Sequence, residues 1–225
     1  MRKSILALAA VSAILFALPA VASAEETWQI HPNNVKFTAS SGETRLGTTA
    51  GDTVICTSST GEGQYVSSTT AEGIKLKFHG CKDAGTGVSC HSGSTAGTIE
   101  TNPIIAHNVW ANKHGVRTRA VLLTPANTEK ADFATFRCTV FGIGPTLTVT
   151  GSVIGEVELT KPCNTPAAEA HLDFVAEKHG HQTIKTLWNT TPEYDLTSHR
   201  DGVPSTASQT GTGTLKFAPE ATVTC

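Results

Sequence analysis

The stretch Gly73-Ile74-Lys75-Leu76-Lys77-Phe78-His79 alternates apolar and polar side chains without a break. Successive side chains of a β-strand point to opposite faces, so Ile74, Leu76 and Phe78 share one face and the lysines and the histidine share the other. The stretch therefore predicts a strand with one face in the core and one face in solvent.

The same two-residue period recurs along the chain, between clusters of Gly, Asn, Asp, Ser and Pro. The other segments that show it are 35–40, 53–57, 64–67, 116–124, 131–140, 146–159 with a break near Gly151, and 214–217. Clusters such as 58–63 and 142–145 are expected to be turns. Short strands separated so often by turn residues predict an all-β fold, an antiparallel sandwich or barrel-like domain stabilised by disulfides.

The segment 165–180 fits two secondary structures. Pro166 in a first turn and Gly180 at the end favour a helix. The alternation of Leu172 and Phe174 with polar neighbours favours a strand instead. The pattern alone leaves both alternatives open.

Residues 1–24 have the three parts of a secretory signal peptide. Two basic residues precede an apolar run, and Ala22-Ser23-Ala24 follows it. We expect cleavage after Ala24, which leaves 25–225 as one secreted β domain with a candidate sub-boundary near 161–166. Nothing later is apolar enough to cross a membrane, so we expect a released protein, extracellular or loosely associated with the cell envelope.

The charge balance argues against nucleic acid as a partner. The chain has 17 Lys and Arg against 19 Asp and Glu, and Arg2 and Lys3 would leave with the signal peptide. The mature charge would then change from −2 to −4, because 15 basic residues remain against 19 acidic ones. Proteins that track phosphates concentrate basic residues instead.

Six cysteines in an exported chain predict three disulfides, although six cysteines can pair in many ways. They are Cys56, Cys81, Cys90, Cys138, Cys163 and Cys225. A bridge from Cys81 to Cys90 is predicted because these two residues flank a short, turn-rich segment that closes easily. The absence of a Cys-x-x-Cys pair disfavours a thiolate metal site.

Strand alternation suggests the second bridge. Val54 and Cys56 share one strand face, and Phe136 and Cys138 share another, so both cysteines are expected to point into the core. Cys56 would then bridge to Cys138 and tie two sheets together. The third pair, Cys163 with Cys225, would fix the C-terminal residue.

Seven short motifs, taken in order, carry a resemblance to a known group. They are Phe37-Thr38-Ala39-Ser40, Cys56-Thr57-Ser58, Phe78-His79-Gly80-Cys81, Cys90-His91-Ser92, Ala96-Gly97-Thr98-Ile99-Glu100-Thr101-Asn102, Phe136-Arg137-Cys138 and Gly151-Ser152-Val153-Ile154-Gly155. In this order the chain resembles a group of uncharacterised secreted actinobacterial proteins over roughly residues 35–160. The resemblance implies an exported β-rich domain, a framework that includes the first four cysteines, and a strand around Leu172. It carries over no functional residues.

The histidines give only a weak metal hypothesis. His179-Gly180-His181 could place two imidazoles on one side of an extended segment, with His171 or His199 completing a zinc site. The spacing matches no zinc signature, so solvent-exposed loop histidines are the favoured interpretation. We therefore assign no metal ligand and no cofactor.

A hydrolase hypothesis rests on Cys90-His91-Ser92-Gly93-Ser94, where serines lie beside a histidine. No Gly-x-Ser-x-Gly elbow is present, and sequence neighbours on a strand point to opposite sides. Glu156 and Glu158 share one strand face and are expected to be solvated rather than a glycosidase pair. We assign no catalytic residue.

Two further kinds of site are considered. Lys82, in the loop between Cys81 and Cys90, would present a protease-inhibitor bait if the loop were closed by a disulfide. Sparse aromatic residues are expected to plug sheet ends rather than bind sugars, and a small basic cluster is expected to be a solvated face. The aromatic residues are Trp28, Trp110, Trp188 and Tyr194, and the basic ones are Lys113, Arg117 and Arg119.

Together these patterns favour a secreted, non-enzymatic β module that binds or is structural at the cell envelope or outside the cell. Its partner would be an extracellular protein, a glycan or a small ligand. A secreted hydrolase is the first alternative, and a protease inhibitor that presents the Cys81 to Cys90 loop is the second.

Overall fold

The structure is a computed structural model that describes residues 27–126, 132–177 and 180–225. All regular structure in these ranges is β-strand, paired antiparallel throughout. The predicted signal peptide, 1–24, lies outside them. Within the described ranges, no helix is long and apolar enough to span a bilayer.

Eight of the strands form a closed ring, which we call the first ring. In order of pairing they are β2 (Lys36–Ser41), β5 (Ser58–Tyr65), β6 (Thr70–His79), β10 (Ile104–Lys113), β11 (Val116–Pro125), β14 (Val153–Leu159), β15 (Pro166–Phe174) and β18 (Val203–Thr224), which pairs back to β2. The predicted all-β fold is confirmed. Of the two predicted architectures, the barrel-like one is observed.

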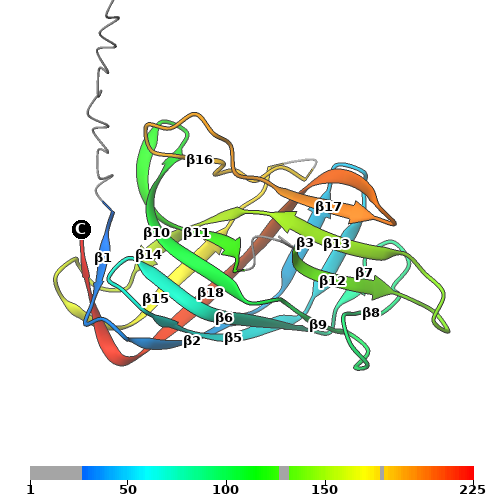
Figure 1. Cartoon of the computed structure of the whole chain (residues 1–225), viewed down its shortest axis with the longest axis horizontal. Helices are drawn as coiled ribbons and strands as arrows, with labels where there is room; N and C mark the ends of the chain where they lie inside the picture. Colours follow the sequence, from blue (N-terminus) through cyan, green and yellow to red (C-terminus); the bar gives the residue numbers. More distant parts are fainter. Residues whose placement is uncertain (1–26, 127–131, 178–179) are drawn as a thin grey trace, which may run out of the picture.

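A second ring continues from the first. Its strands are β3 (Thr44–Thr48), β4 (Thr53–Cys56), β7 (Lys82–Asp83), β8 (Cys90–His91), β12 (Asp132–Cys138), β13 (Thr146–Gly151), β17 (Leu196–Arg200) and the first part of β18, which pairs back to β3. A bridge between Lys82 and Ser89 links β7 to the start of β8. The 22-residue β18 belongs to both rings and crosses the length of the molecule (Figure 1).

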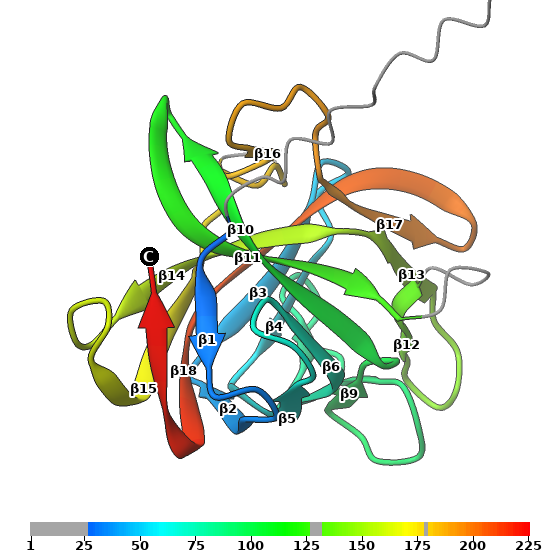
Figure 2. The ribbon, with the colours of Figure 1, turned by 60° about the vertical axis from the view of Figure 1, so that its left-hand side comes forward.

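Three short strands lie outside the rings. β9 (Thr98–Glu100) pairs with β6, and β16 (Thr186–Leu187) pairs with β10. β1 (Gln29–His31) pairs with the end of β18, so the start of the described chain lies beside the C-terminus (Figure 2). Trp28, just before β1, is 2% exposed, and its indole N–H donates to the carbonyl oxygens of Val109 and Ala120, both at 3.0 Å. The expected role of Trp28 as a core plug is confirmed.

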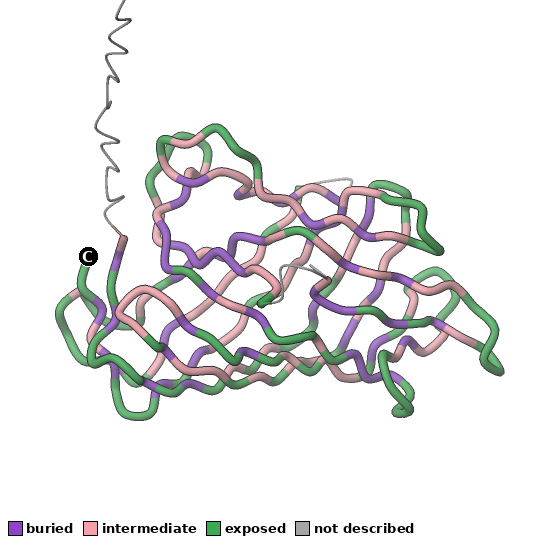
Figure 3. Tube along the Cα trace, viewed as in Figure 1, coloured by how far each residue is buried: buried purple, intermediate pink, exposed green. Residues whose placement is uncertain are grey.

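The core lies inside both rings, and the connecting loops are mostly exposed (Figure 3). A smaller second cluster lies on the outer face of β10, β11 and β14, where residues such as Ala111 and Ile154 are buried. Ile184 and Leu187 cover this face from the segment 180–194. That segment therefore follows the outside of the first ring.

Most of the strands predicted from alternation are present, including the break between β13 and β14 near Gly151. The turn predicted for 58–63 is wrong, because these residues belong to β5. Gly61 and Gly63 face inward there, where a Cβ would lie 2.5 Å from Leu76 Cδ2 and 2.6 Å from Phe37 Cζ, respectively. Glycine is needed at these positions for packing and not for a turn.

The ambiguous segment is a strand, as the resemblance implied. β15 lies between β14 and β18 and exchanges backbone hydrogen bonds with both, which outweighs the local signals for a helix. Residues 160–165 connect β14 to β15, which pair with each other.

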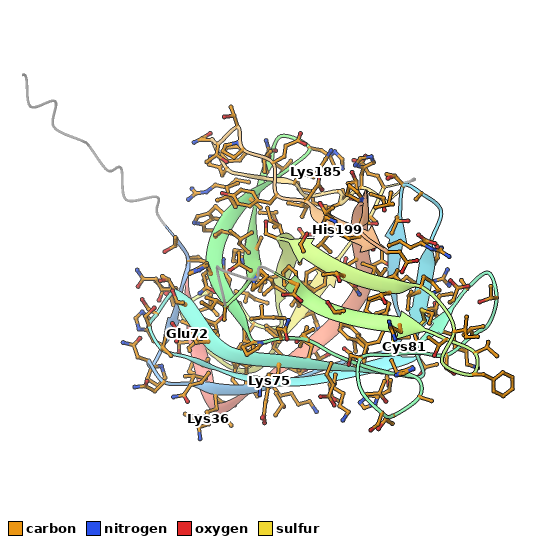
Figure 4. All side chains as sticks on the ribbon, turned by 45° about the vertical axis from the view of Figure 1, so that its right-hand side comes forward. Lys36, Glu72, Lys75, Cys81, Lys185 and His199 are labelled. Carbon is orange, nitrogen blue, oxygen red and sulfur yellow. A yellow bond between two sulfur atoms is a disulfide. The ribbon has the colours of Figure 1, made fainter. Side chains whose placement is uncertain are left out.

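Two of the three predicted disulfides are wrong. The bonds are Cys56–Cys81, Cys90–Cys138 and Cys163–Cys225, so only the last prediction is confirmed. Both incorrect pairs involve cysteines of the second ring, which include Cys81 (labelled in Figure 4).

The register of the second ring explains the correction. Ile55 pairs with Lys82, Lys82 with Ser89, and Cys90 with Cys138, so the four cysteines form one row across neighbouring strands. Each bond joins directly adjacent residues with a Cα–Cα distance of 3.9 Å. Three strand spacings separate Cys56 from Cys138, about 14 Å, which exceeds the reach of a disulfide. A bridge from Cys81 to Cys90 would therefore have left Cys56 and Cys138 unable to pair with each other.

Candidate functional site

An apolar cavity of about 180 Å³ lies inside the stacked rings. Its walls come from both rings, with Leu76, Leu172 and Leu215 from the first and Val54 and Phe136 from the second. Protein interiors are normally packed to crystal-like density with few voids larger than a water molecule. A cavity of this size is therefore the most distinctive internal feature of the described chain.

The cavity exists because one stretch of wall has small side chains. Ser41 pairs with Ser59 on β5 and with Gly213 on β18, so three small residues lie side by side across adjacent strands. The next inward-facing row brings Gly61 beside Ala39. The small side chains of Ser41 and Ser59, and the absence of one at Gly213, leave this part of the lining open.

The glycines of this wall differ in how closely they are packed. A Cβ at Gly61 would clash with Leu76, whereas a Cβ at Gly213 would meet nothing nearer than the Ser40 carbonyl oxygen at 3.4 Å. That distance is an ordinary van der Waals contact. Gly213 therefore borders open space, and its extended backbone accepts a side chain.

The lining is uncharged. Among the described residues that line the cavity there is no Asp, Glu, Lys, Arg or His. Charged side chains such as Lys36 and Lys75 are exposed on the outer surface instead (Figure 4). The polar side chains of the lining are few: Ser40, Ser41, Thr44, Ser59, Tyr65, Thr101 and Gln209.

Tyr65 is the most deeply buried of these polar groups. Its hydroxyl donates to Asn108 Oδ1 at 3.0 Å, and the Asn108 amide donates to the Trp28 and Ser68 carbonyl oxygens. Burial raises the pKa of Tyr65 far above its ordinary value, although the hydrogen bond with Asn108 lowers it somewhat. A fully bonded polar network of this kind fixes the Tyr65 side chain at the cavity wall.

The second polar group of the wall is the pair Ser41 and Ser59, whose hydroxyl oxygens are 2.7 Å apart. Ser41 also donates to the Gly42 carbonyl oxygen at 3.0 Å. Gln209 donates from its side-chain nitrogen to the Thr210 carbonyl oxygen at 3.3 Å. These groups are the specific hydrogen-bonding features of an otherwise apolar site.

The structure does not assemble the histidine site considered from sequence. His171 contacts Thr214 Oγ1 on its paired strand at 3.3 Å, and His199 contacts Thr150 Oγ1 on the neighbouring strand at 3.4 Å. His179 lies outside the described residues. Among the residues that are described, no group of three His, Cys, Asp or Glu side chains is placed to hold a metal ion.

The serine and histidine of the turn after Cys90 are also kept apart. Ser92 Oγ accepts a hydrogen bond from the Glu100 amide at 2.8 Å, while His91 contacts the Gly93 carbonyl oxygen and Thr139 Oγ1. No contact joins the Ser92 hydroxyl to the His91 ring. This turn is therefore not arranged as a nucleophile and its base.

The basic cluster and the two glutamates form an ordinary polar surface. Lys113 Nζ lies 2.5 Å from Glu156 Oε2, and Thr118 donates to the other carboxylate oxygen at 2.7 Å. Partial burial raises the pKa of Glu156, but these two hydrogen bonds outweigh it and leave the pKa below its usual value. Glu158 is exposed on the same strand, and Arg119 donates to the sulfurs of the disulfide at the C-terminus.

The remaining aromatic candidates do not form a binding platform. Trp110 is covered by Arg117, whose guanidinium carbon lies 4.2 Å from the ring centroid. Tyr194 packs against the second cluster, and Trp188 is half-buried. Among the exposed large apolar residues, the two with the highest exposed fractions lie at the tip of the loop between β12 and β13, where Phe141 and Ile143 are 100% and 82% exposed.

Three of the buried polar atoms in the range 181–198 that lack a hydrogen-bond partner in the described chain belong to an Asp, a His and a Ser, and of these residues only His181 was considered from sequence. Asp195 Oδ1, His181 Nδ1 and Ser198 Oγ are buried and have no hydrogen-bond partner among the described residues. Burial raises the pKa of Asp195, and Lys185 and His181 oppose that shift. These three residue types occur in hydrolases, but no hydrogen bond connects the serine to the histidine.

Sequence analysis also missed the cavity itself. The small residues that line it, Ser41, Ser59 and Gly213, are consistent with turn chemistry when the pairing is unknown. No protein-family model, no curated protein and no solved structure matches the chain, so the interpretation of this site rests on its geometry.

Proposed function

We propose that the mature chain is an exported, non-enzymatic binding module that holds one small apolar molecule inside its stacked rings. The observation that carries this proposal is the cavity of about 180 Å³ with its uncharged, predominantly apolar lining. An apolar molecule gains free energy on leaving water roughly in proportion to the surface that it buries. The cavity offers such burial without the need to open the core.

The volume limits the ligand to a small molecule. An engineered apolar cavity of about 150 Å³ binds benzene, whereas drug-sized ligands occupy pockets of about 300–1,000 Å³. At about 180 Å³, the cavity fits a molecule slightly larger than benzene. Among the partners considered from sequence, a small ligand is therefore favoured over an extracellular protein or a glycan.

The contacts of the polar candidates support binding over hydrolysis. Ser92 and His91 are engaged with separate partners, and Ser198 is hydrogen-bonded to neither His181 nor Asp195. The inhibitor alternative loses its closing disulfide, because Cys81 and Cys90 bond to other strands. A loop without its own bridge is less preorganised for docking to a protease.

Export is supported by the disulfides and by the N-terminal sequence pattern. All six cysteines form bonds that persist in oxidising compartments. The positively charged start, the apolar run and the Ala22-Ser23-Ala24 exit are typical of a secretory signal peptide. A ligand taken up outside the cell or in the envelope is consistent with both features.

The proposal is tested by titrating the disulfide-intact mature protein with benzene and toluene. Binding is followed through the methyl NMR signals of wall residues such as Leu172 and Leu215. We expect saturable shifts confined to residues that line the cavity. The Gly213→Val variant, which places three carbon atoms in the cavity, is expected to lose these shifts. Non-saturable shifts in the wild type, or equal binding by the variant, would overturn the proposal.

A further inference from the structure

We propose that the molecule held in the cavity is a small neutral alcohol whose hydroxyl group donates a hydrogen bond to Ser59 Oγ. This inference rests on the proposed function and adds the chemical class of the ligand. The charge of the lining, the hydrogen bonds of the pair Ser41 and Ser59, and the cavity volume support this class.

The charge of the lining excludes an ionised ligand. No Lys, Arg or His among the described lining residues faces the cavity, so a carboxylate would be buried without a counterion. Burial of an unpaired charge in an apolar environment costs far more free energy than the apolar part of a small molecule gains. Fatty acids and other small anions are therefore disfavoured relative to neutral molecules.

The hydrogen bonds of Ser41 and Ser59 determine which polar group of a ligand fits this wall. A serine hydroxyl has one proton to donate and two lone pairs that accept. Ser41 donates its proton to the Gly42 carbonyl oxygen, so the proton between the two serines comes from Ser59. Both protons are then used, and Ser59 Oγ retains acceptor capacity. A ligand that complements Ser59 brings a donor.

The surroundings of Ser59 fit an alcohol with an apolar body. Ser59 lies in the cavity lining between Ser41 on β2 and Phe78 on β6, and Gly213 lies beyond Ser41. A hydroxyl group placed at this small-residue wall leaves the rest of the molecule among apolar side chains of the lining, such as Phe136 and Leu123. One polar contact in an apolar site is the usual arrangement for orienting a small ligand.

The cavity volume sets the size of the alcohol. A cavity of about 150 Å³ accommodates benzene, which has six heavy atoms, so by proportion about 180 Å³ accommodates about seven heavy atoms. Cyclohexanol has this size. Cyclohexanone has the same size but only accepts hydrogen bonds, methylcyclohexane has no polar atom, and hexanoate is a charged molecule of similar bulk.

These four compounds are the probes of the test, which uses calorimetric titration of the disulfide-intact mature protein. We expect cyclohexanol to bind about fivefold more tightly than cyclohexanone, which corresponds to one net hydrogen bond of about 1 kcal/mol. Methylcyclohexane cannot donate a hydrogen bond, so Ser59→Ala is expected to leave its affinity unchanged. Hexanoate is expected to show no binding. In Ser59→Ala the preference for the alcohol over the ketone should fall below about twofold.

A matched control is available on the same strand. Ser58 neighbours Ser59 but does not line the cavity, so Ser58→Ala should keep the wild-type preference. The melting temperature of each variant shows that it is folded. Tighter binding of the ketone than of the alcohol would mean that the ligand accepts a hydrogen bond from a lining hydroxyl such as that of Thr101. That result would overturn the inference.

The failure of this inference can be told apart from failure of the proposed function. If cyclohexanol and cyclohexanone bind equally and Ser59→Ala changes nothing, the cavity binds apolar molecules but the alcohol class is wrong. If neither benzene nor any of the neutral probes binds, both the proposed function and the proposed ligand class are wrong.

Discussion

Replacement of Gly213 by valine tests whether the interior of the protein holds a cavity that a side chain can fill. Gly213 lines the cavity from β18, and a Cβ there has its nearest neighbour at 3.4 Å. The backbone is extended, so valine introduces no conformational strain. The variant is therefore expected to fold as the wild type does and to be more stable.

The magnitude follows from the atoms added. Three buried carbon atoms contribute about 2.4 kcal/mol at about 0.8 kcal/mol each, and the lost rotamer freedom of valine removes about 0.5 kcal/mol. We expect the free energy of unfolding to rise by about 2 kcal/mol through cavity filling. For a chain of this size the melting temperature should increase by about 4–8 °C.

A second glycine supplies the control for this measurement. Gly47 lies on β3, does not line the cavity, and would place a Cβ 3.9 Å from Ser208 Oγ. Gly47→Val shares the loss of glycine freedom in the unfolded chain but fills no void. The assay is urea denaturation of both variants with the disulfides intact. A Gly213→Val variant that is no more stable than Gly47→Val would refute the assignment of open space beside Gly213.

Three other predictions concern single groups. Replacement of both Cys163 and Cys225 by serine opens a loop with a sequence separation of 62, so the free energy of unfolding should fall by about 4 kcal/mol in urea titrations. Because burial raises the pKa of Asp195, its contribution to stability is present below the unfolded value of about 3.9 and is lost as the pH rises through the folded pKa. Asp195→Asn should therefore stabilise the protein at pH 7 and give no gain at pH 3, measured by thermal melts. In Tyr194→Phe, Tyr65 is the one tyrosine that remains, and its raised pKa predicts that tyrosinate absorbance appears only when alkali unfolds the chain. Tyrosinate absorbance at a pH where circular dichroism still shows the folded state would contradict that assignment.

Local alternation predicted the parts of the fold in which a strand has one buried face. The stretch 73–79 forms most of β6 because its apolar residues face the core and its lysines face solvent. β10 was missed because both of its faces are buried at several positions, including Asn108 and Val109, so its sequence does not alternate. The outer face of β10 is buried by the segment 180–194, which no local rule reveals.

The disulfides show the same limit. Alternation correctly placed Cys56 and Cys138 on inward faces, since both are buried. It could not show that the chain brings Cys81 beside Cys56, which depends on pairing of β7 with β4 across the sequence. Partner choice among cysteines is a property of strand register, which a single sequence does not specify.

The candidate site was hidden for a related reason. Ser59, Ser41 and Gly213 are ordinary turn or surface residues until the pairing of β2 with β5 and β18 places them on one inward wall. Their role depends on which strands pair and on which side chains face them across the cavity, and neither can be read from the local sequence. Only the apolar character of the other walls was foreseeable.

The size of the cavity is itself an argument for an occupant. Voids cost about 24 cal/mol per Å³, so a space of about 180 Å³ lowers stability by about 4 kcal/mol when it is empty. A single valine at Gly213 recovers about half of that without strain in the backbone. A wall that instead combines Gly213 with Ser41 and Ser59 forgoes this stabilisation and leaves the Ser59 hydroxyl in the lining of the space. A neutral ligand that fills the space and donates to Ser59 would recover both the packing and the hydrogen bond, so the stability of the protein should rise with ligand concentration.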